Sequence, residues 1–234
     1  MPGQGKGFTF SGRNTKRRLS FSMWNVNGLH DRILGNKFEN ADFISHLNNF
    51  DFLVLTETWT HRTVIFPSFV CFNSIDNNKS NTSGRVSGGV TILFKKHLTS
   101  KIVLQKTSKN FVWCQIDKSL VGTDKHLYLC GAYIPPENSH HYSNDLFEEL
   151  ENDISHFRSK GKIMLLGDLN ARTVKSNDYI TADGYHFLCS GQAAFAETRN
   201  NLDNNTNNHG KFILEICKNF DIRILNGRFR GDSL

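Results

Sequence analysis

Polar residues that could bind a metal ion and a phosphate occur at the ends of four apolar runs in the sequence. Each run reads as a β-strand, and the polar segments that end them are WNVNG (24–28), TETW (56–59), AYIPP (132–136) and GDLN (167–170). In open α/β sheets, binding sites form beyond the carboxyl ends of the strands. We therefore expect Glu57 and Asp168 to converge on one rim, with the amides of Asn25 and Asn170 beside them. Two carboxylates and two amides suit a hard cation and a phosphate.

Asn25 and Glu57 are the candidates for the cation end of this site. The Glu57 carboxylate emerges directly after the buried run 52–55, and magnesium needs only a few protein oxygens because it keeps several waters. The Asn25 amide could donate to a phosphate oxygen or accept from a metal-bound water. Taken alone, Glu57 is better explained as a residue that caps a loop or pairs with an arginine, but the other three segments favour the metal site. The pair Asn27 and Gly28 is typical of a tight turn.

Asp168, Asn170 and Tyr133 are the other candidates for this site. Gly167 lets the backbone approach closely where the strand ends. Hydrolysis of a phosphodiester requires an in-line water and stabilisation of a charged transition state. An Asx-turn is the ordinary alternative for Asp168, and a position in the core is the alternative for Tyr133.

In order and wording, these segments resemble the endonuclease/exonuclease/phosphatase superfamily. Within it they look most like the apurinic-type endonuclease domain of non-LTR (LINE-like) retrotransposons, over about residues 19–228. The resemblance implies that Glu57 and Asn25 lie at a Mg2+ or Mn2+ ion and that Asp168 orients or deprotonates the attacking water. It also implies that Asn170 and Tyr133 contact the phosphate. Such a domain nicks target DNA for a reverse transcriptase domain that follows it in the full-length protein.

The last motif of that family, a Ser-Asp-His segment, has no counterpart after Asp168. His186 and His209 stand in other contexts. We therefore expect a C-terminally truncated domain whose second sheet is incomplete and which could be inactive as a fragment. Losing acid–base help or charge stabilisation typically lowers a rate by about 100-fold or more.

The apolar patterns predict an α/β fold. Strands are expected at 19–24, 52–55, 69–72, 88–94, 101–104, 111–116, 126–133, 163–166 and 222–225, and helices at 37–48, 144–158 and around 212–220. Ser143 is the expected cap of the second helix. This mixture favours a layered α/β sandwich. The resemblance adds that it contains two mixed β-sheets flanked by helices, which is the DNase I-like arrangement.

Charge gives only weak support for a DNA partner. The net charge is +6, but five basic and no acidic side chains lie in residues 1–18, so the rest of the chain is nearly neutral. We interpret residues 1–18 as a basic flexible leader and 19–234 as the folded domain. Arg17 and Arg18 in the leader could bind the DNA backbone, as could Arg85 in a predicted turn.

Composition excludes several other classes of protein. A hydrophobic content of 38% with 19 Phe indicates a folded chain. No apolar run of about 18 residues predicts a membrane span, and the N-terminus lacks the apolar region of a secretory signal. Five scattered Cys without CxxC spacing favour reduced thiols. We therefore expect a nuclear or cytoplasmic protein that is not secreted.

Two other functions remain open on the sequence alone. One is a different branch of the superfamily, a phosphomonoesterase or a sphingomyelinase-like phosphodiesterase, because one metal–phosphate chemistry serves all branches. The other is a catalytically silent remnant that binds DNA through its basic leader. Competition by DNA tests the first alternative, and deletion of residues 1–18 tests the second.

Overall fold

The computed structural model describes residues 6–10, 19–31, 35–60, 64–74, 88–180 and 199–228. These residues form two compact units. The first comprises Met1–Pro135 and Ser139–Leu169, and the second comprises residues 136–138 and 170–234. The predicted DNA contacts Arg17, Arg18 and Arg85 lie outside the described residues.

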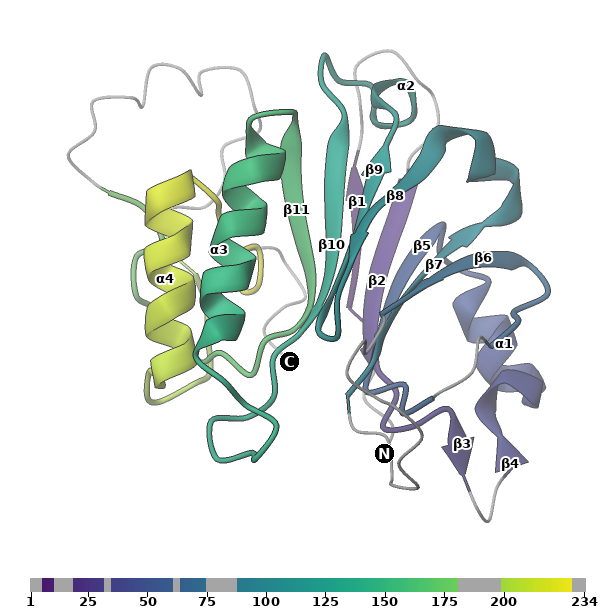
Figure 1. Ribbon diagram of the computed structural model, residues 1–234, viewed down its shortest axis with the longest axis horizontal. Helices are drawn as coiled ribbons and strands as arrows, with labels where there is room; N and C mark the ends of the chain where they lie inside the picture. The colour runs from purple at the N-terminus through teal and green to yellow at the C-terminus, as the bar shows by residue number, and fades with distance from the viewer. Residues whose placement is uncertain are drawn as a thin grey trace. The chain divides into compact units, whose positions relative to one another are not determined.

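A five-stranded mixed sheet forms one layer of the first unit (Figure 1). Its strands, in spatial order, are β1 (Lys6–Phe10), β2 (Leu19–Asn25), β5 (Phe52–Thr56), β7 (Val90–Lys95) and β6 (Phe69–Asn73). Only β2 and β5 run parallel, and the other neighbours are antiparallel. All five residues of β5 are buried, as a short uninterrupted apolar run predicts for a central strand.

A four-stranded mixed sheet forms the next layer. Its strands, in spatial order, are β11 (Lys162–Asp168), β10 (Leu127–Tyr133), β9 (Phe111–Ile116) and β8 (Ile102–Thr107). Strands β10 and β11 are parallel, while β9 pairs antiparallel with both β10 and β8. The predicted α/β architecture with two mixed sheets is therefore confirmed.

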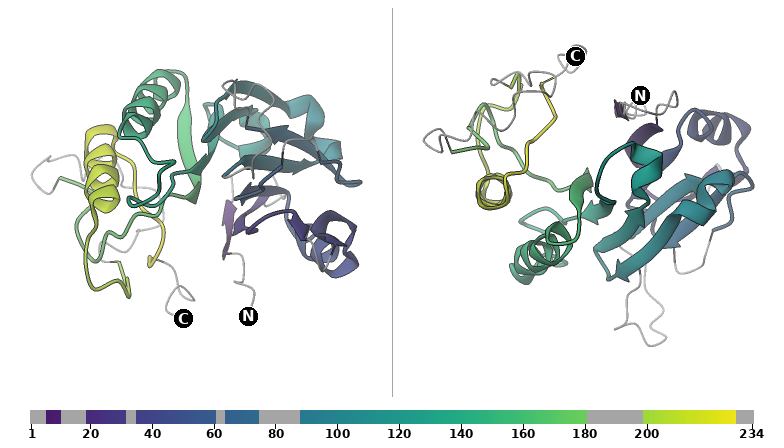
Figure 2. Two further views of the ribbon diagram at one scale, coloured as in Figure 1. Left: turned by 60° about the horizontal axis from the view of Figure 1, so that its bottom comes forward. Right: turned by 90° about the horizontal axis from the view of Figure 1, so that it is seen from above.

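The two sheets pack face to face (Figure 2), and buried side chains between them form a hydrophobic core. The core joins buried side chains of both sheets, among them Phe21 and Phe52 from one and Val112 and Leu129 from the other. Gly131 in β10 faces the other sheet at close range. A Cβ there would come within 3.0–3.2 Å of three side chains of β5 and β7. A larger residue would push the sheets apart.

Helices cover the outer faces of both sheets. Helix α1 (Ala41–Leu47) buries Phe43 and Leu47 in a second core against the five-stranded sheet. Helix α3 (Asp145–Arg158) places Phe157 against Trp113 and Tyr128 of the four-stranded sheet. The smaller elements are β3 (His30–Asp31), β4 (Gly35–Asn36), η1 (Lys37–Glu39), η2 (Lys96–Lys101) and α2 (Lys118–Val121). Among the described residues, no helix is long and apolar enough to cross a membrane.

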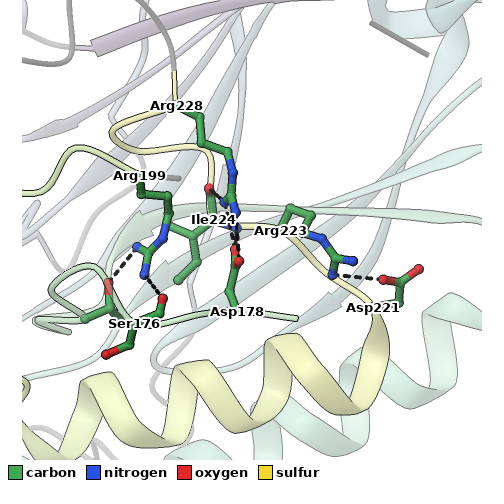
Figure 3. A network of polar contacts seen from close by, with 8 residues as sticks. Ser176, Asp178, Arg199, Asp221, Arg223, Ile224 and Arg228 are labelled. Atoms are coloured by element: carbon green, nitrogen blue, oxygen red, sulfur yellow. Dashed lines mark hydrogen bonds and ion pairs between the residues drawn. The ribbon is translucent and has the colours of Figure 1, made fainter. Parts of the chain in front are cut away.

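The second unit contains helix α4 (Asn208–Phe220) and a buried ionic network (Figure 3). The side chain of Asn207 caps the helix by accepting a hydrogen bond from the Gly210 N–H. In the network, both guanidinium Nη atoms of Arg228 lie 2.8 Å from the Asp178 carboxylate oxygens, and the Ile224 N–H donates to the same carboxylate. The Arg228 and Asp178 side chains are 2% and 0% exposed.

Four local expectations were wrong. The helix expected over residues 37–48 is divided, because the extended Asn40 ends η1 and caps α1 by accepting from Phe43 N–H. Residues 222–225 do not form a strand, since Ile224 donates to Asp178 instead of a neighbouring strand.

The other two wrong expectations concern the N-terminal leader and the N-cap of α3. Lys6–Phe10, expected within a flexible leader, pairs antiparallel with β2 as strand β1. Helix α3 has Asn144 as its N-cap, although the Ser143 hydroxyl accepts a hydrogen bond from the Asp145 N–H as a cap would.

Candidate active site

The ends of four strands supply the side chains of the candidate site. Asn25 and Tyr133 are the last residues of β2 and β10, Asp168 is the last residue of β11, and Glu57 directly follows β5. Strands β2 and β5 form the parallel pair of one sheet, and β10 and β11 form the parallel pair of the other. Because parallel strands end on the same edge, each pair presents its side chains on one rim.

The Asn25 amide joins the carboxylates of the two sheets. Its Nδ2 lies 2.8 Å from Oε1 of Glu57 and 3.0 Å from Oδ2 of Asp168. Its Oδ1 accepts a hydrogen bond from the Asn27 N–H at 3.1 Å, which fixes the orientation of the amide. In this arrangement Asn25 orients both carboxylates through its nitrogen. Two carboxylates thus lie within hydrogen-bonding distance of one nitrogen.

Tyr133 completes the cluster from the four-stranded sheet. Its hydroxyl is hydrogen-bonded to the Glu57 carboxylate. Burial, together with the negative charges of Glu57 and Asp168, raises the pKa of Tyr133 well above its usual range. The phenol therefore keeps its proton at neutral pH and remains a hydrogen-bond donor beside the carboxylates.

The backbone that carries Glu57 is held by the two neighbouring loops. Glu57 adopts a left-handed conformation with φ of 53°. Its carbonyl accepts from Gly28 N–H at 2.7 Å, and the next residue, Thr58, donates to Gly89 O at 3.4 Å. A residue other than glycine in this conformation is strained and persists only where its surroundings impose it.

Two residues that the sequence did not indicate also support the site. The Asn110 side chain donates to the Tyr133 carbonyl at 2.7 Å, and the Asn110 carbonyl accepts from the Tyr133 N–H at 2.9 Å. The Lys37 ammonium donates to the Val26 carbonyl, directly after Asn25. An asparagine before a strand and a lysine in a short helix carry no sequence signal for such roles, because both contacts depend on the folded chain.

Asn170 belongs to the second unit. It has a left-handed backbone with φ of 47°, and its carbonyl accepts a hydrogen bond from the Asn207 side chain at 2.8 Å. A local Asx-turn does not account for the side chain of the neighbouring Asp168, because its carboxylate accepts a hydrogen bond from Asn25, 143 residues away.

The donor set fits a small, hard divalent cation. Among the described residues, no group of three or more His, Cys, Asp or Glu could hold a metal ion. Magnesium, however, is typically bound by one or two carboxylates, with waters and substrate phosphates completing the shell. The carboxylates of Glu57 and Asp168 satisfy that need, and the neutral amide and phenol beside them do not neutralise their charge.

Comparison with known proteins identifies the family. The sequence profile described as the Endonuclease/Exonuclease/phosphatase family matches residues 24–209, which include all four side chains of the cluster. The chain therefore belongs to this family. A search of curated proteins found no match.

Solved structures resemble this chain over most of its length. One is TDP2 from Caenorhabditis elegans, with a TM-score of 0.43 and 16% identity over 66% of this chain and 48% of that chain. Another is an AP endonuclease from Archaeoglobus fulgidus, with a TM-score of 0.41 and 16% identity over 71% of this chain and 63% of that one. The human Nocturnin catalytic domain with bound sulfate gives a TM-score of 0.43 and 13% identity over 80% and 73%. The chain spans about half the length of the TDP2 structure.

Proposed function

We propose that this chain is a divalent-metal-dependent phosphodiesterase that nicks DNA, the endonuclease domain of a non-LTR retrotransposon protein. The observation that supports this most is the Asn25 amide held between Glu57 and Asp168, which come from opposite sheets. Such a cluster concentrates negative charge and oxygen donors at one point of the rim. Membership of the family supports phosphoester chemistry, and the wording of the motifs supports the retrotransposon branch.

Glu57 and Asp168 would hold the ion and the water. Mg2+ or Mn2+, bound through Glu57, would polarise the phosphate as a Lewis acid. Asp168 would orient the attacking water and accept its proton. Asn25 would hold both carboxylates in position through its hydrogen bonds of 2.8 and 3.0 Å. Positioning and charge stabilisation are the main contributions a protein makes to phosphoryl transfer.

Tyr133 would donate a hydrogen bond from its phenol to a non-bridging phosphate oxygen. Its raised pKa suits that role, because the phenol stays protonated beside two carboxylates. By the resemblance, Asn170 would contact the same phosphate. Arg17, Arg18 and Arg85 would bind the DNA backbone electrostatically, so affinity would fall steeply with salt.

The test is nicking of supercoiled plasmid by this chain with Mg2+, beside a Glu57→Ala variant. We expect nicking that Glu57→Ala lowers by at least about 100-fold. The matched control is Glu148→Ala, which removes an exposed glutamate of α3 and should leave the rate unchanged. Replacement of Mg2+ by Mn2+ should retain nicking, and a chelator should abolish it.

Two results would contradict the proposal. Nicking that survives Glu57→Ala would show that the cluster is not the site. Failure of the folded chain to nick DNA, with hydrolysis of a small phosphomonoester that DNA does not inhibit, would favour the phosphatase branch.

A further inference from the structure

Trp59 stands on the same rim as Glu57, in a backbone conformation that a bulky residue rarely adopts. Its φ is 47°, and Glu57, two residues earlier, has a φ of 53°. Left-handed backbone at a bulky residue is an outlier that glycine or asparagine would relieve. Strain of this kind gathers at binding and catalytic sites, where the surroundings impose it.

Three glycines make room for this turn. Gly28, Gly88 and Gly89 all have positive φ, between 74° and 91°. A Cβ on Gly89 would lie 2.4 Å from the Thr58 hydroxyl, and the Gly88 carbonyl accepts from Trp59 N–H at 3.1 Å. The segment 57–59 is thus fixed between the loop that follows β2 and the loop that precedes β7.

The indole ring packs against the loop that carries Asn25. A Cβ on Gly28 would lie 2.6 Å from the ring, and the Gly28 N–H donates to the Glu57 carbonyl. Trp59 is only partly buried, in contrast with Trp113, which is 0% exposed in the core. Part of this residue therefore remains accessible to solvent beside the loop that carries Asn25.

We propose that Trp59 forms a nucleoside subsite: its indole contacts the base of the nucleotide next to the scissile phosphate. This inference rests on the proposed function and names the substrate feature that the site recognises. Aromatic side chains stack on any base, since every base has a π-face, so the contact selects nucleic acid over lipid or inositol phosphoesters without selecting a sequence.

The test compares binding of DNA with binding of a baseless oligomer of the same length, made of tetrahydrofuran phosphates. Ca2+ replaces Mg2+ so that binding is measured without cleavage. The variants are Trp59→Asn, which removes the ring and suits a left-handed backbone, and Trp59→Phe, which keeps an aromatic ring. We expect Trp59→Asn to weaken DNA binding about 5- to 100-fold and Trp59→Phe to weaken it less. Binding of the baseless oligomer should not change.

Tryptophan fluorescence gives a second readout. The chain has three tryptophans, and Trp113 is buried. Trp24 packs on Phe43 and His46 between β2 and α1, so Trp24→Phe is the matched control. DNA should quench the fluorescence of the wild-type chain and of Trp24→Phe, and should not quench that of Trp59→Phe.

The outcomes separate this inference from the proposed function. A wild-type chain that nicks DNA, with Trp59→Asn binding DNA and the baseless oligomer as tightly as wild type does, overturns the subsite alone. Equal losses for both ligands, or quenching that persists in Trp59→Phe, overturn it as well. A folded wild-type chain that neither binds nor nicks DNA overturns both proposals.

Discussion

The candidate site and the ionic network of the second unit hold their carboxylates in opposite ways. Glu57 and Asp168 are hydrogen-bonded by the neutral amide of Asn25, and Glu57 also by the neutral phenol of Tyr133. Asp178 is hydrogen-bonded by the guanidinium of Arg228 at two atoms and by a backbone N–H.

Under the proposed function, this difference distinguishes a site that binds a ligand from an ion pair that is complete within the fold. Neutral donors orient a carboxylate without cancelling its charge, so the cluster of the first unit can still attract a cation. A bidentate guanidinium cancels the charge and satisfies the oxygens, so Asp178 serves the fold. Arg199 extends that network by donating to Thr173 Oγ1 at 2.8 Å and to the Ser176 carbonyl at 2.5 Å, while burial lowers its pKa (Figure 3).

The largest expected effect is that of Arg228→Ala on stability. The substitution leaves the Asp178 carboxylate buried without its guanidinium partner, which typically costs about 3–5 kcal/mol. The matched control is Arg223→Ala. Arg223 pairs with Asp221 at 2.9 Å, but both side chains are exposed (36% and 69%), so its loss should cost about 1 kcal/mol or less. Urea unfolding measures the free energy of unfolding of both variants. Equal losses would show that the buried pair stabilises the fold no more than the exposed pair does.

The pH dependence of the free energy of unfolding tests whether the ionised Asp178 carboxylate stabilises the fold. Burial raises the pKa of Asp178, but hydrogen bonds from Arg228 and the Ile224 N–H outweigh it, so the pKa lies below its usual value. The stabilisation is therefore complete above the unfolded pKa of about 4 and is lost as the pH falls through the lower pKa of the folded protein. The stability difference between wild type and Asp178→Asn should shrink in that acidic window. A difference that stays constant down to the acid unfolding of the chain would show that the ionised carboxylate does not stabilise the fold.

The sequence indicated the candidate residues because strand ends have a local signature. An apolar run followed by a polar segment nominated Asn25, Glu57 and Asp168, and the structure joins their side chains by hydrogen bonds. The supporting contact of Asn110 with Tyr133 was not predictable. It depends on the register of β9 and β10, which places the two backbones side by side.

Periodicity predicted the sheets but could not decide where pairing stops. Residues 111–116 form β9 with the predicted bounds, because the run is apolar and its partners lie on both sides. Residues 222–225 have a similar apolar character, yet Ile224 donates to a carboxylate 46 residues earlier in the chain. The pairing of Asp178 with Arg228 spans 50 residues and leaves no periodic trace in the sequence.

Replacing one left-handed glycine of each region by alanine should give a smaller difference in stability. Gly227 has a φ of 80°, and a Cβ there would lie 2.2 Å from the Asn200 carbonyl oxygen, which is backbone and cannot turn away. Gly28 has a φ of 86°, but its Cβ would meet the Trp59 side chain. Both variants incur strain of about 1–2 kcal/mol, and Gly227→Ala should lose clearly more because of the backbone clash. Thermal unfolding ranks them, and a Gly28→Ala variant as unstable as Gly227→Ala would show that Trp59 cannot move.

The smallest expected effect is that of Asp168→Asn, and its sign should be opposite to that of Asp178→Asn. In the site, Asp168→Asn removes one of two like charges that share the Asn25 nitrogen, so stability should stay unchanged or rise by up to about 1 kcal/mol. In the network, Asp178→Asn removes the partner of the buried Arg228, so stability should fall. Urea unfolding of both variants at neutral pH and without divalent cations measures the two signs. Sites that bind ligands commonly keep residues that lower stability in the free protein. A clear loss of stability in Asp168→Asn would mean that its carboxylate, like that of Asp178, is satisfied within the fold and is not held for a cation.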